Sequence, residues 1–285
     1  MSFALALLAA ATALPAPAAS ADRQELARQC AGKDGFSDPA PSARIFGNVW
    51  YVGTCGVSVL LITGPQGHIL VDAGMEDAVP QVLGNIRRLG FRARDIRLIV
   101  TSHEHFDHIG GLSALQKATG ARTVATAAAA RVIRSGRISP ADPQVQEIHG
   151  AAPASVDRIL HTGDVFSVGP LQITAFATPG HTEGSTSWYW TSCEGQDCRK
   201  FTYVDSLTAL PLGTYRFADH PDRVAMFRAT FAQVDALDCG ILLTPHPSAS
   251  AMFERMSGEQ PLETADACRT LAAAARERLD KALAK

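Results

Sequence analysis

Two parts of the chain repeat the same order of apolar and polar segments. Residues 44–74 hold short β-rich segments separated by glycine, which predict a meander of strands. Apolar side chains recur at helical spacing over residues 76–90, and Gly90 stands where the helix would end. The short apolar run IRLIVTS at residues 96–102 is typical of a strand buried on both faces of a sheet.

The same alternation continues to the C-terminus. A Pro-rich stretch at residues 139–153 predicts a long loop. The other predicted elements are helices at 110–119, 127–136, 221–236 and 262–285 and strands at 122–126, 164–168, 171–178, 185–192, 200–204 and 239–245. Because no linker separates the two parts, we expect an α/β fold in which two fused strand-helix halves share one core.

Composition excludes several classes of partner. The chain has 285 residues, of which 46% are hydrophobic, and its formal net charge is -2. Lys and Arg are scattered, so the sequence lacks the basic patch that nucleic-acid binding requires. We therefore expect no nucleic acid partner, and no feature of the sequence points to an obligate protein partner.

The first 21 residues are apolar, too short for a comfortable membrane span, and end in small residues. They predict a secretory signal at 1–21, although no Lys or Arg precedes the apolar stretch. A disordered Ala-rich tail or a membrane anchor are the alternatives. Export to the periplasm leaves residues 22–285 as a single mature domain without a membrane span.

Six cysteines agree with export, because an even number in an oxidising compartment is usually paired. Six cysteines allow fifteen connectivities, and the sequence proves none of them. Reduced thiols are the alternative, and a cysteine zinc site is disfavoured because no Cys-x-x-Cys pair occurs. From their placement, the pairs we expect are Cys30 with Cys55, Cys193 with Cys198, and Cys239 with Cys268.

The segment TSHEHFDHIGG at residues 101–111 concentrates titratable side chains directly after the predicted buried strand. His103 and His105 are one residue apart, so in an extended segment their side chains point the same way and can bind one ion. Asp107 and His108 follow where the chain turns into a helix and can face a second ion. Such a match arises by chance about once in two thousand sequences of this composition, so a metal site explains it better than a charged turn.

Two further histidines follow predicted strands, where the sheet edge gathers ligands. His181 lies in ATPGHTEGST and His246 in LLTPHPSAS. The remaining histidines are interpreted as ordinary core or surface residues: His68, His149, His161 and His220.

The motifs HEHFDH, PGHTEGS, DSLT and TPHP, in this order, resemble the metallo-β-lactamase superfamily, and more narrowly its subclass B3. The resemblance spans nearly the whole mature chain, includes the three cysteine pairs, and implies an αββα four-layer sandwich. It implies two zinc ions per chain. The first would be held by His103, His105 and His181, and the second by Asp107, His108 and His246.

The resemblance also assigns roles at DSLT. Ser206 would hydrogen-bond a zinc-bound water and Thr208 would help to bind the substrate carboxylate. Simple strand-end hydroxyls are the alternative for both. Most hydrolases of the superfamily place a bridging aspartate near Asp205. We assign no role to Tyr215, because extra residues separate it from the serine motif.

The implied reaction is hydrolysis of the β-lactam amide bond of penicillins, cephalosporins and carbapenems by a metal-bound hydroxide, which would confer β-lactam resistance. Asp107 would orient the nucleophile, and Asp72 is a candidate acceptor that orients a ligand histidine. The loops at 139–156 and 207–217 would set the substrate range.

Three alternatives are also compatible with the sequence. One is another dizinc hydrolase of the fold, a lactonase or thioesterase, with Asp205 bridging the metals. The second is an iron-dependent oxidoreductase such as a persulfide dioxygenase. The third is a non-catalytic zinc-binding module.

Overall fold

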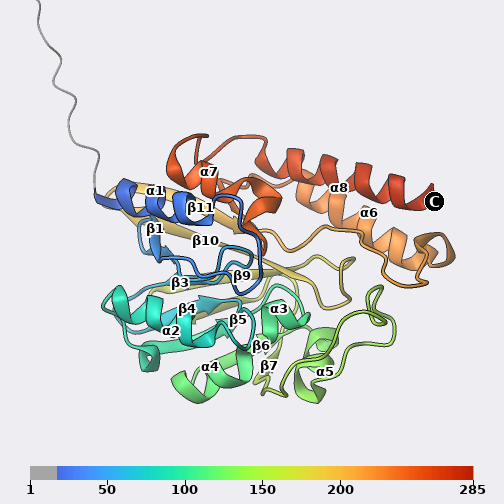
Figure 1. The fold of residues 1–285 in the computed structure, drawn as a ribbon, viewed down its shortest axis with the longest axis horizontal. Helices are drawn as coiled ribbons and strands as arrows, with labels where there is room; N and C mark the ends of the chain where they lie inside the picture. The colour runs from blue at the N-terminus through green and yellow to red at the C-terminus, as the bar shows by residue number, and fades with distance from the viewer. Residues whose placement is uncertain (1–17, 285) are drawn as a thin grey trace, which may run out of the picture.

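The computed structural model describes residues 18–284, in which two β-sheets pack face to face (Figure 1). Helices cover the outer face of each sheet, which gives the four layers of the predicted αββα sandwich. Most of the predicted signal segment lies outside the described residues. Among residues 18–284, none of the helices combines the length and the apolar composition that a membrane span needs.

The first sheet has seven strands in the order β1-β2-β3-β4-β5-β6-β7. Strands β1 to β4 form the predicted antiparallel meander, and β4 to β7 run parallel. Helices link the parallel strands, as parallel pairing requires. The strands are β1 Ala43–Phe46, β2 Val49–Tyr51, β3 Leu60–Ile62, β4 His68–Val71, β5 Ile96–Val100, β6 Arg122–Ala125 and β7 Arg158–Ile159, and the helices are α2 Val79–Arg88, α3 Phe106–Ile109, α4 Leu112–Thr119 and α5 Ala127–Ser135.

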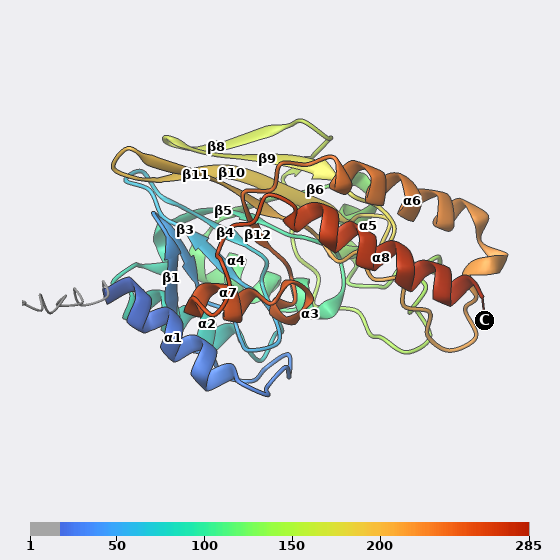
Figure 2. The ribbon, with the colours of Figure 1, turned by 90° about the horizontal axis from the view of Figure 1, so that it is seen from above.

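The second sheet has five strands in the order β12-β11-β10-β9-β8, antiparallel except for the parallel pair β11 and β12. Helices α6 and α8 lie side by side on its outer face (Figure 2). The elements are β8 Val165–Val168, β9 Leu171–Ala177, β10 Thr186–Glu194, β11 Asp197–Tyr203, β12 Ile241–Leu243, α6 Pro221–Asp235, α7 Met252–Ser257 and α8 Ala267–Leu283.

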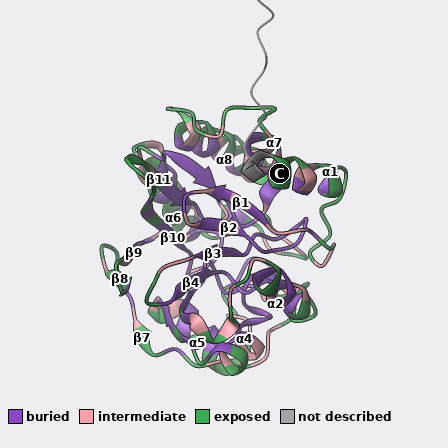
Figure 3. Cartoon of the chain, turned by 90° about the vertical axis from the view of Figure 1, so that its left-hand side faces the viewer, coloured by how far each residue is buried: buried purple, intermediate pink, exposed green. Residues whose placement is uncertain are grey.

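Alternation along the strands divides the interior into three cores. In β3, Leu60 and Ile62 face the space between the sheets, and Leu61 faces the helices of the first half. Strand β12 alternates in the same way between the central core and the core under α6 and α8. Strands β3, β4 and β12 are therefore buried on both faces, whereas buried and exposed residues alternate along β8. The outward faces of the helices are exposed (Figure 3).

Helices α1 and α7 were not predicted from the sequence. Helix α1, Ala18–Cys30, packs on β1 and α7, but it is strongly polar and buries mainly Leu26 and Cys30. The predicted C-terminal helix at 262–285 starts later in the structure, where α8 begins at Ala267. Helix α7 precedes the predicted range and ends before Gly258, whose φ of 92° is left-handed.

All six cysteines are paired as expected. The first disulfide joins the end of α1 to the segment before β3, the second lies across the β10–β11 hairpin, and the third joins the start of β12 to α8. The pairs are Cys30–Cys55, Cys193–Cys198 and Cys239–Cys268.

Candidate metal centre

Three chain segments meet where β5, β9 and β12 end. The chain after β5 supplies His103, His105, Asp107 and His108, the turn between β9 and β10 supplies His181, and the turn after β12 supplies His246. Five of these side chains are at most 8% exposed, while that of His246 is 28% exposed. The structure thus brings together all six predicted metal ligands.

His103, His105 and His181 form the first donor set. One ring nitrogen from each lies within 4.8 Å of the others. The ring centroids are 4.7 to 4.9 Å apart, and the rings are steeply inclined to one another. Three imidazoles converge on one point and leave a fourth direction open, which fits a catalytic zinc site.

Asp107, His108 and His246 form the second donor set. Oδ2 of Asp107 lies 3.1 Å from Nε2 of His108 and 3.4 Å from Nε2 of His246, and the two nitrogens are 3.3 Å apart. Ligands about 2.0–2.1 Å from a tetrahedral zinc ion are separated by about 3.3 Å. The triangle of donors therefore has the size that zinc requires. His103 lies between the sets, with its ring centroid 4.2 Å from that of His108.

In each of the five imidazoles, the ring nitrogen that points away from the donor set contacts an oxygen atom. Metal-binding histidines are normally held in this way, because the second nitrogen fixes the tautomer and the ring orientation. The five contacts are His103 Nδ1 to Asp205 Oδ1 at 2.7 Å, His105 Nε2 to Asp142 Oδ2 at 3.0 Å, His108 Nδ1 to Asp72 Oδ2 at 3.2 Å, His181 Nδ1 to the Thr208 carbonyl at 2.8 Å and His246 Nδ1 to the Gly56 carbonyl at 2.9 Å. The donor set and its surroundings fit two zinc ions.

The electrostatics of the two sets differ. Burial and the neighbouring histidines lower the pKa of His181 to about 3 and that of His103 well below its usual range. Both are therefore neutral near pH 7, which is the form that binds metal. Burial opposes the charge on His108, but the carboxylates of Asp107 and Asp72 outweigh it and raise its pKa to about 10.

Asp72 contacts one of the predicted ligand histidines, with its Oδ2 3.2 Å from Nδ1 of His108. Its carboxylate accepts hydrogen bonds from the backbone N–H and the hydroxyl of Ser102, at 2.6 and 2.8 Å, and from the hydroxyl of Tyr203 at 2.6 Å. Its φ of 62° is unusual for a residue other than glycine. This network connects the end of β4, the metal-binding segment after β5 and strand β11 in the second sheet.

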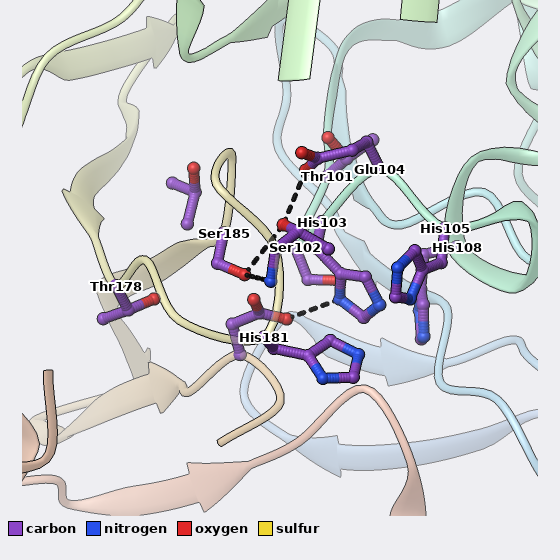
Figure 4. A network of polar contacts seen from close by, with 12 residues as sticks. Thr101, Ser102, His103, Glu104, His105, His108, Thr178, His181 and Ser185 are labelled. Atoms are coloured by element: carbon purple, nitrogen blue, oxygen red, sulfur yellow. Dashed lines mark hydrogen bonds and ion pairs between the residues drawn. The ribbon is translucent and has the colours of Figure 1, made fainter. Parts of the chain in front are cut away.

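Glu104 lies between two predicted ligands but joins neither donor set (Figure 4). Its carboxylate is 3% exposed and accepts hydrogen bonds from the hydroxyl of Thr182 at 2.7 Å and the N–H of Gly184 at 3.0 Å. Burial raises its pKa. Because Thr182 directly follows His181, Glu104 fastens the turn that carries His181 to the segment that carries His103 and His105.

A cavity of about 450 Å³ opens over the donor sets. Phe36 forms one wall, with its ring centroid 5.3 Å from that of His246. The loop between α5 and β7 contributes Gln144 and Ile148 to the lining. The segment after β11 contributes Ser206, Thr208, Leu210 and Leu212.

The other residues considered from the sequence lie elsewhere. Tyr215 is absent from the cavity lining, and its ring stacks on His220 at 4.2 Å. The four histidines interpreted as ordinary residues lie outside both donor sets: His68, His149, His161 and His220. Asp205 stands behind His103, with its Oδ2 buried and without a hydrogen-bond partner.

Sequence reasoning missed Asp142 and Glu104. Asp142 lies in a Pro-rich loop without periodicity, 37 residues from the histidine that it contacts. Glu104 lies inside the motif itself, so its acidic character was available as a signal, but its partners come from the turn after β9.

Comparison with known proteins agrees with this architecture. Residues 52–194 match the family model of the metallo-beta-lactamase superfamily. The solved metallo-β-lactamase MIM-1 from Novosphingobium pentaromativorans is 49% identical, with a TM-score of 0.89 over 92% of this chain and 97% of that chain. The chain belongs to the metallo-β-lactamase superfamily.

Other members of the superfamily show where the chain lies within it. MEM-A1, a subclass B3 metallo-β-lactamase from a soil metagenome library, is 40% identical, with a TM-score of 0.84 over 88% of this chain and 98% of that one. A hydroxyacylglutathione hydrolase from Brucella anthropi is 26% identical over 73% of each chain. These identities confirm the resemblance of the chain to subclass B3. The chain is less similar to the hydroxyacylglutathione hydrolase than to MEM-A1.

Proposed function

We propose that this chain is a subclass B3 metallo-β-lactamase that hydrolyses the amide bond of β-lactams, with two zinc ions bound by the two donor sets. The observation that carries the proposal is the convergence of both donor sets beneath one cavity, in a chain 49% identical to MIM-1 over most of both lengths. His103, His105 and His181 would hold the first ion. Asp107, His108 and His246 would hold the second.

The roles of the residues follow from their positions. Bound zinc supplies Lewis acidity and makes water nucleophilic near neutral pH. Asp107, whose pKa is lowered by His108 despite its burial, remains ionised and orients the water that attacks the lactam carbonyl. Ser206 lines the cavity, and its hydroxyl assists in holding that water.

Thr208 is proposed to bind the carboxylate that β-lactams carry beside the ring. Thr208 lines the cavity, and its backbone carbonyl accepts a hydrogen bond from Nδ1 of His181 at 2.8 Å. This contact fixes the backbone of Thr208 relative to the first donor set, which would let its hydroxyl bind the carboxylate of a substrate held over the metals.

We also propose that residues 1–21 direct export to the periplasm, where β-lactam hydrolysis would give resistance. Three disulfides support an oxidising compartment. Residues 22–285 are proposed to form one mature domain that needs only a small-molecule substrate and no protein or nucleic acid partner.

A second candidate, hydrolysis of thioesters, is favoured by the similarity to the hydroxyacylglutathione hydrolase. Asp205 would then bridge the metals. The lower identity and the position of Asp205 behind His103 make this the weaker proposal.

Hydrolysis of a penicillin and a carbapenem by purified mature protein, followed at the lactam absorbance, tests the proposal. We expect turnover that a chelator abolishes and zinc restores. His103→Ala is expected to be inactive, and His161→Ala, which changes an exposed histidine, is expected to be unaffected. Zinc-loaded, folded protein without turnover of either substrate would contradict the proposal.

A further inference from the structure

The loop at residues 137–157, between α5 and β7, is attached to the metal centre by one carboxylate. Asp142 is 4% exposed, although it lies in a loop beside Pro140 and Pro143. Its Oδ2 lies 3.0 Å from Nε2 of His105, and its Oδ1 accepts a hydrogen bond from the N–H of Gln144 at 2.8 Å. The two oxygens thus contact a predicted metal ligand and the loop backbone.

The backbone held by Asp142 forms a wall of the cavity. Gln144 is 7% exposed, and its carbonyl accepts hydrogen bonds from the N–H groups of Glu147 and Ile148, at 2.9 and 3.2 Å. Gln144 and Ile148 both line the cavity. The path of this wall therefore depends on a turn that begins at Asp142.

Arg223 of α6 provides a second attachment. It is 6% exposed and donates hydrogen bonds to the carbonyl of Ala141 at 2.9 Å and to that of Gly180 at 3.2 Å. Gly180 precedes His181 in the chain. The loop is therefore attached to two ligands of the first donor set, directly at His105 and through Arg223 beside His181.

The outer edge of the loop contacts the other wall of the cavity. Gln146 exchanges hydrogen bonds with Thr214, at 3.0 and 3.1 Å, and the N–H of Leu212 donates to the carbonyl of Pro143 at 3.2 Å. These contacts involve no histidine, so they provide a control for the contact at Asp142.

From these contacts we propose that Asp142 is a positioning residue that couples zinc binding at His105 to the order of the loop at 137–157, and thereby to the shape of the substrate cavity. When Nδ1 of His105 binds metal, Nε2 must carry the hydrogen, and this N–H donates a hydrogen bond to Oδ2 of Asp142. Zinc thus strengthens the anchor of the loop, and by linkage an ordered loop strengthens zinc binding. The coupling rests on the proposed zinc site but not on β-lactam turnover.

Amide hydrogen exchange of the full mature protein, with and without zinc, tests the coupling. In the wild type we expect zinc to slow exchange at Gln144, Glu147 and Ile148 by about tenfold or more. Asp142→Ala is expected to lose this zinc-dependent protection and to bind the first zinc about 10- to 100-fold more weakly. Asp142→Asn keeps the size of the side chain but has one acceptor oxygen instead of two, so we expect an intermediate loss of protection and of zinc affinity. This variant tests the coupling even if Asp142→Ala fails to fold.

Gln146→Ala serves as the matched control, because it removes loop contacts without touching a histidine. We expect it to retain both zinc affinity and zinc-dependent protection. In steady-state assays, Asp142→Asn should raise KM more than it lowers kcat, since the wall is altered and the donor set remains.

The possible outcomes separate this proposal from the proposed function. If zinc-dependent protection requires Asp142 but the protein is inactive on β-lactams, the coupling is supported and the proposed β-lactam substrate is contradicted. Two results would overturn the coupling alone. The first is a wild type that binds two zinc ions tightly while amide exchange in the loop does not change. The second is zinc-dependent protection that stays the same in both Asp142 variants. Failure of the wild type to bind zinc would overturn both.

Discussion

Oδ1 of Asp205 lies 2.7 Å from Nδ1 of His103, on the side of the ring that faces the protein interior. Both side chains are at most 1% exposed, and burial raises the pKa of Asp205 to about 8. In this position Asp205 supports a ligand from behind. This differs from the bridging role that the thioesterase alternative requires.

Substitution of Asp205 distinguishes these two roles. Asp205→Asn retains an oxygen that accepts the hydrogen bond from His103, so we expect two zinc ions per chain by metal analysis. Asp205→Ala removes the acceptor and is expected to weaken zinc binding about 10- to 100-fold. Loss of both metals in Asp205→Asn would instead indicate a bridging ligand.

Glu104→Ala is expected to destabilise the metal-free protein by about 2–4 kcal/mol, because it leaves a cavity and removes the acceptor for Thr182 and Gly184. Denaturant unfolding in chelator measures this change. Zinc binding should weaken as well, since the turn that carries His181 is released. The matched control is Glu147→Ala, which changes an exposed residue. Equal unfolding free energies for the two variants would show that the Glu104 contacts contribute little.

Zinc binding to Asp107, His108 and His246 should release one proton. His108 has a pKa near 10 in the metal-free protein and is protonated at pH 7, whereas burial lowers the pKa of His246 and leaves it neutral. Zinc must displace the proton on His108, so a rise in pH favours binding. The affinity is expected to rise about tenfold per pH unit between pH 7 and 9.

Calorimetry in buffers of different ionisation enthalpy measures this proton release directly. His246→Ala disrupts the second donor set and should abolish the release that accompanies the second zinc equivalent. Affinity that is independent of pH in the wild type would show that His108 is neutral before zinc binds.

The disulfide between Cys239 and Cys268 should stabilise the fold without affecting the metal centre. It spans 29 residues and joins α8 to the start of β12, at the opposite end of that strand from His246. The double substitution to alanine is expected to lower the free energy of unfolding by about 3.5 kcal/mol. Zinc stoichiometry should remain two, and a loss of zinc would show that α8 supports the site.

Sequence patterns predicted those features of the fold and of the metal site whose residues lie close together in the chain. The spacing of His103, His105, Asp107 and His108 and their place after an apolar strand were sufficient to predict a metal site. His181 was found in the same way, because side chains after strands gather at one edge of a sheet. The apolar periodicity likewise predicted both sheets and most helices.

Features set by tertiary contacts could not be read from the sequence. Asp142 reaches His105 only because the path of a long loop returns to the metal centre, and no periodic pattern encodes that path. Helix α1 is polar and buries chiefly Leu26 and Cys30, so its stability comes from α7 and a disulfide. Helix α7, Met252–Ser257, has only six residues, which is too short for an apolar periodicity to indicate it.

A comparison of kcat/KM for a penicillin and for a glutathione thioester, on one zinc-loaded preparation, distinguishes a β-lactamase from a thioesterase. We expect a kcat/KM for the penicillin that is at least about a thousandfold higher, corresponding to about 4 kcal/mol in transition-state stabilisation, and loss of that activity in chelator. Faster hydrolysis of the thioester, by protein that contains two zinc ions, would contradict this expectation.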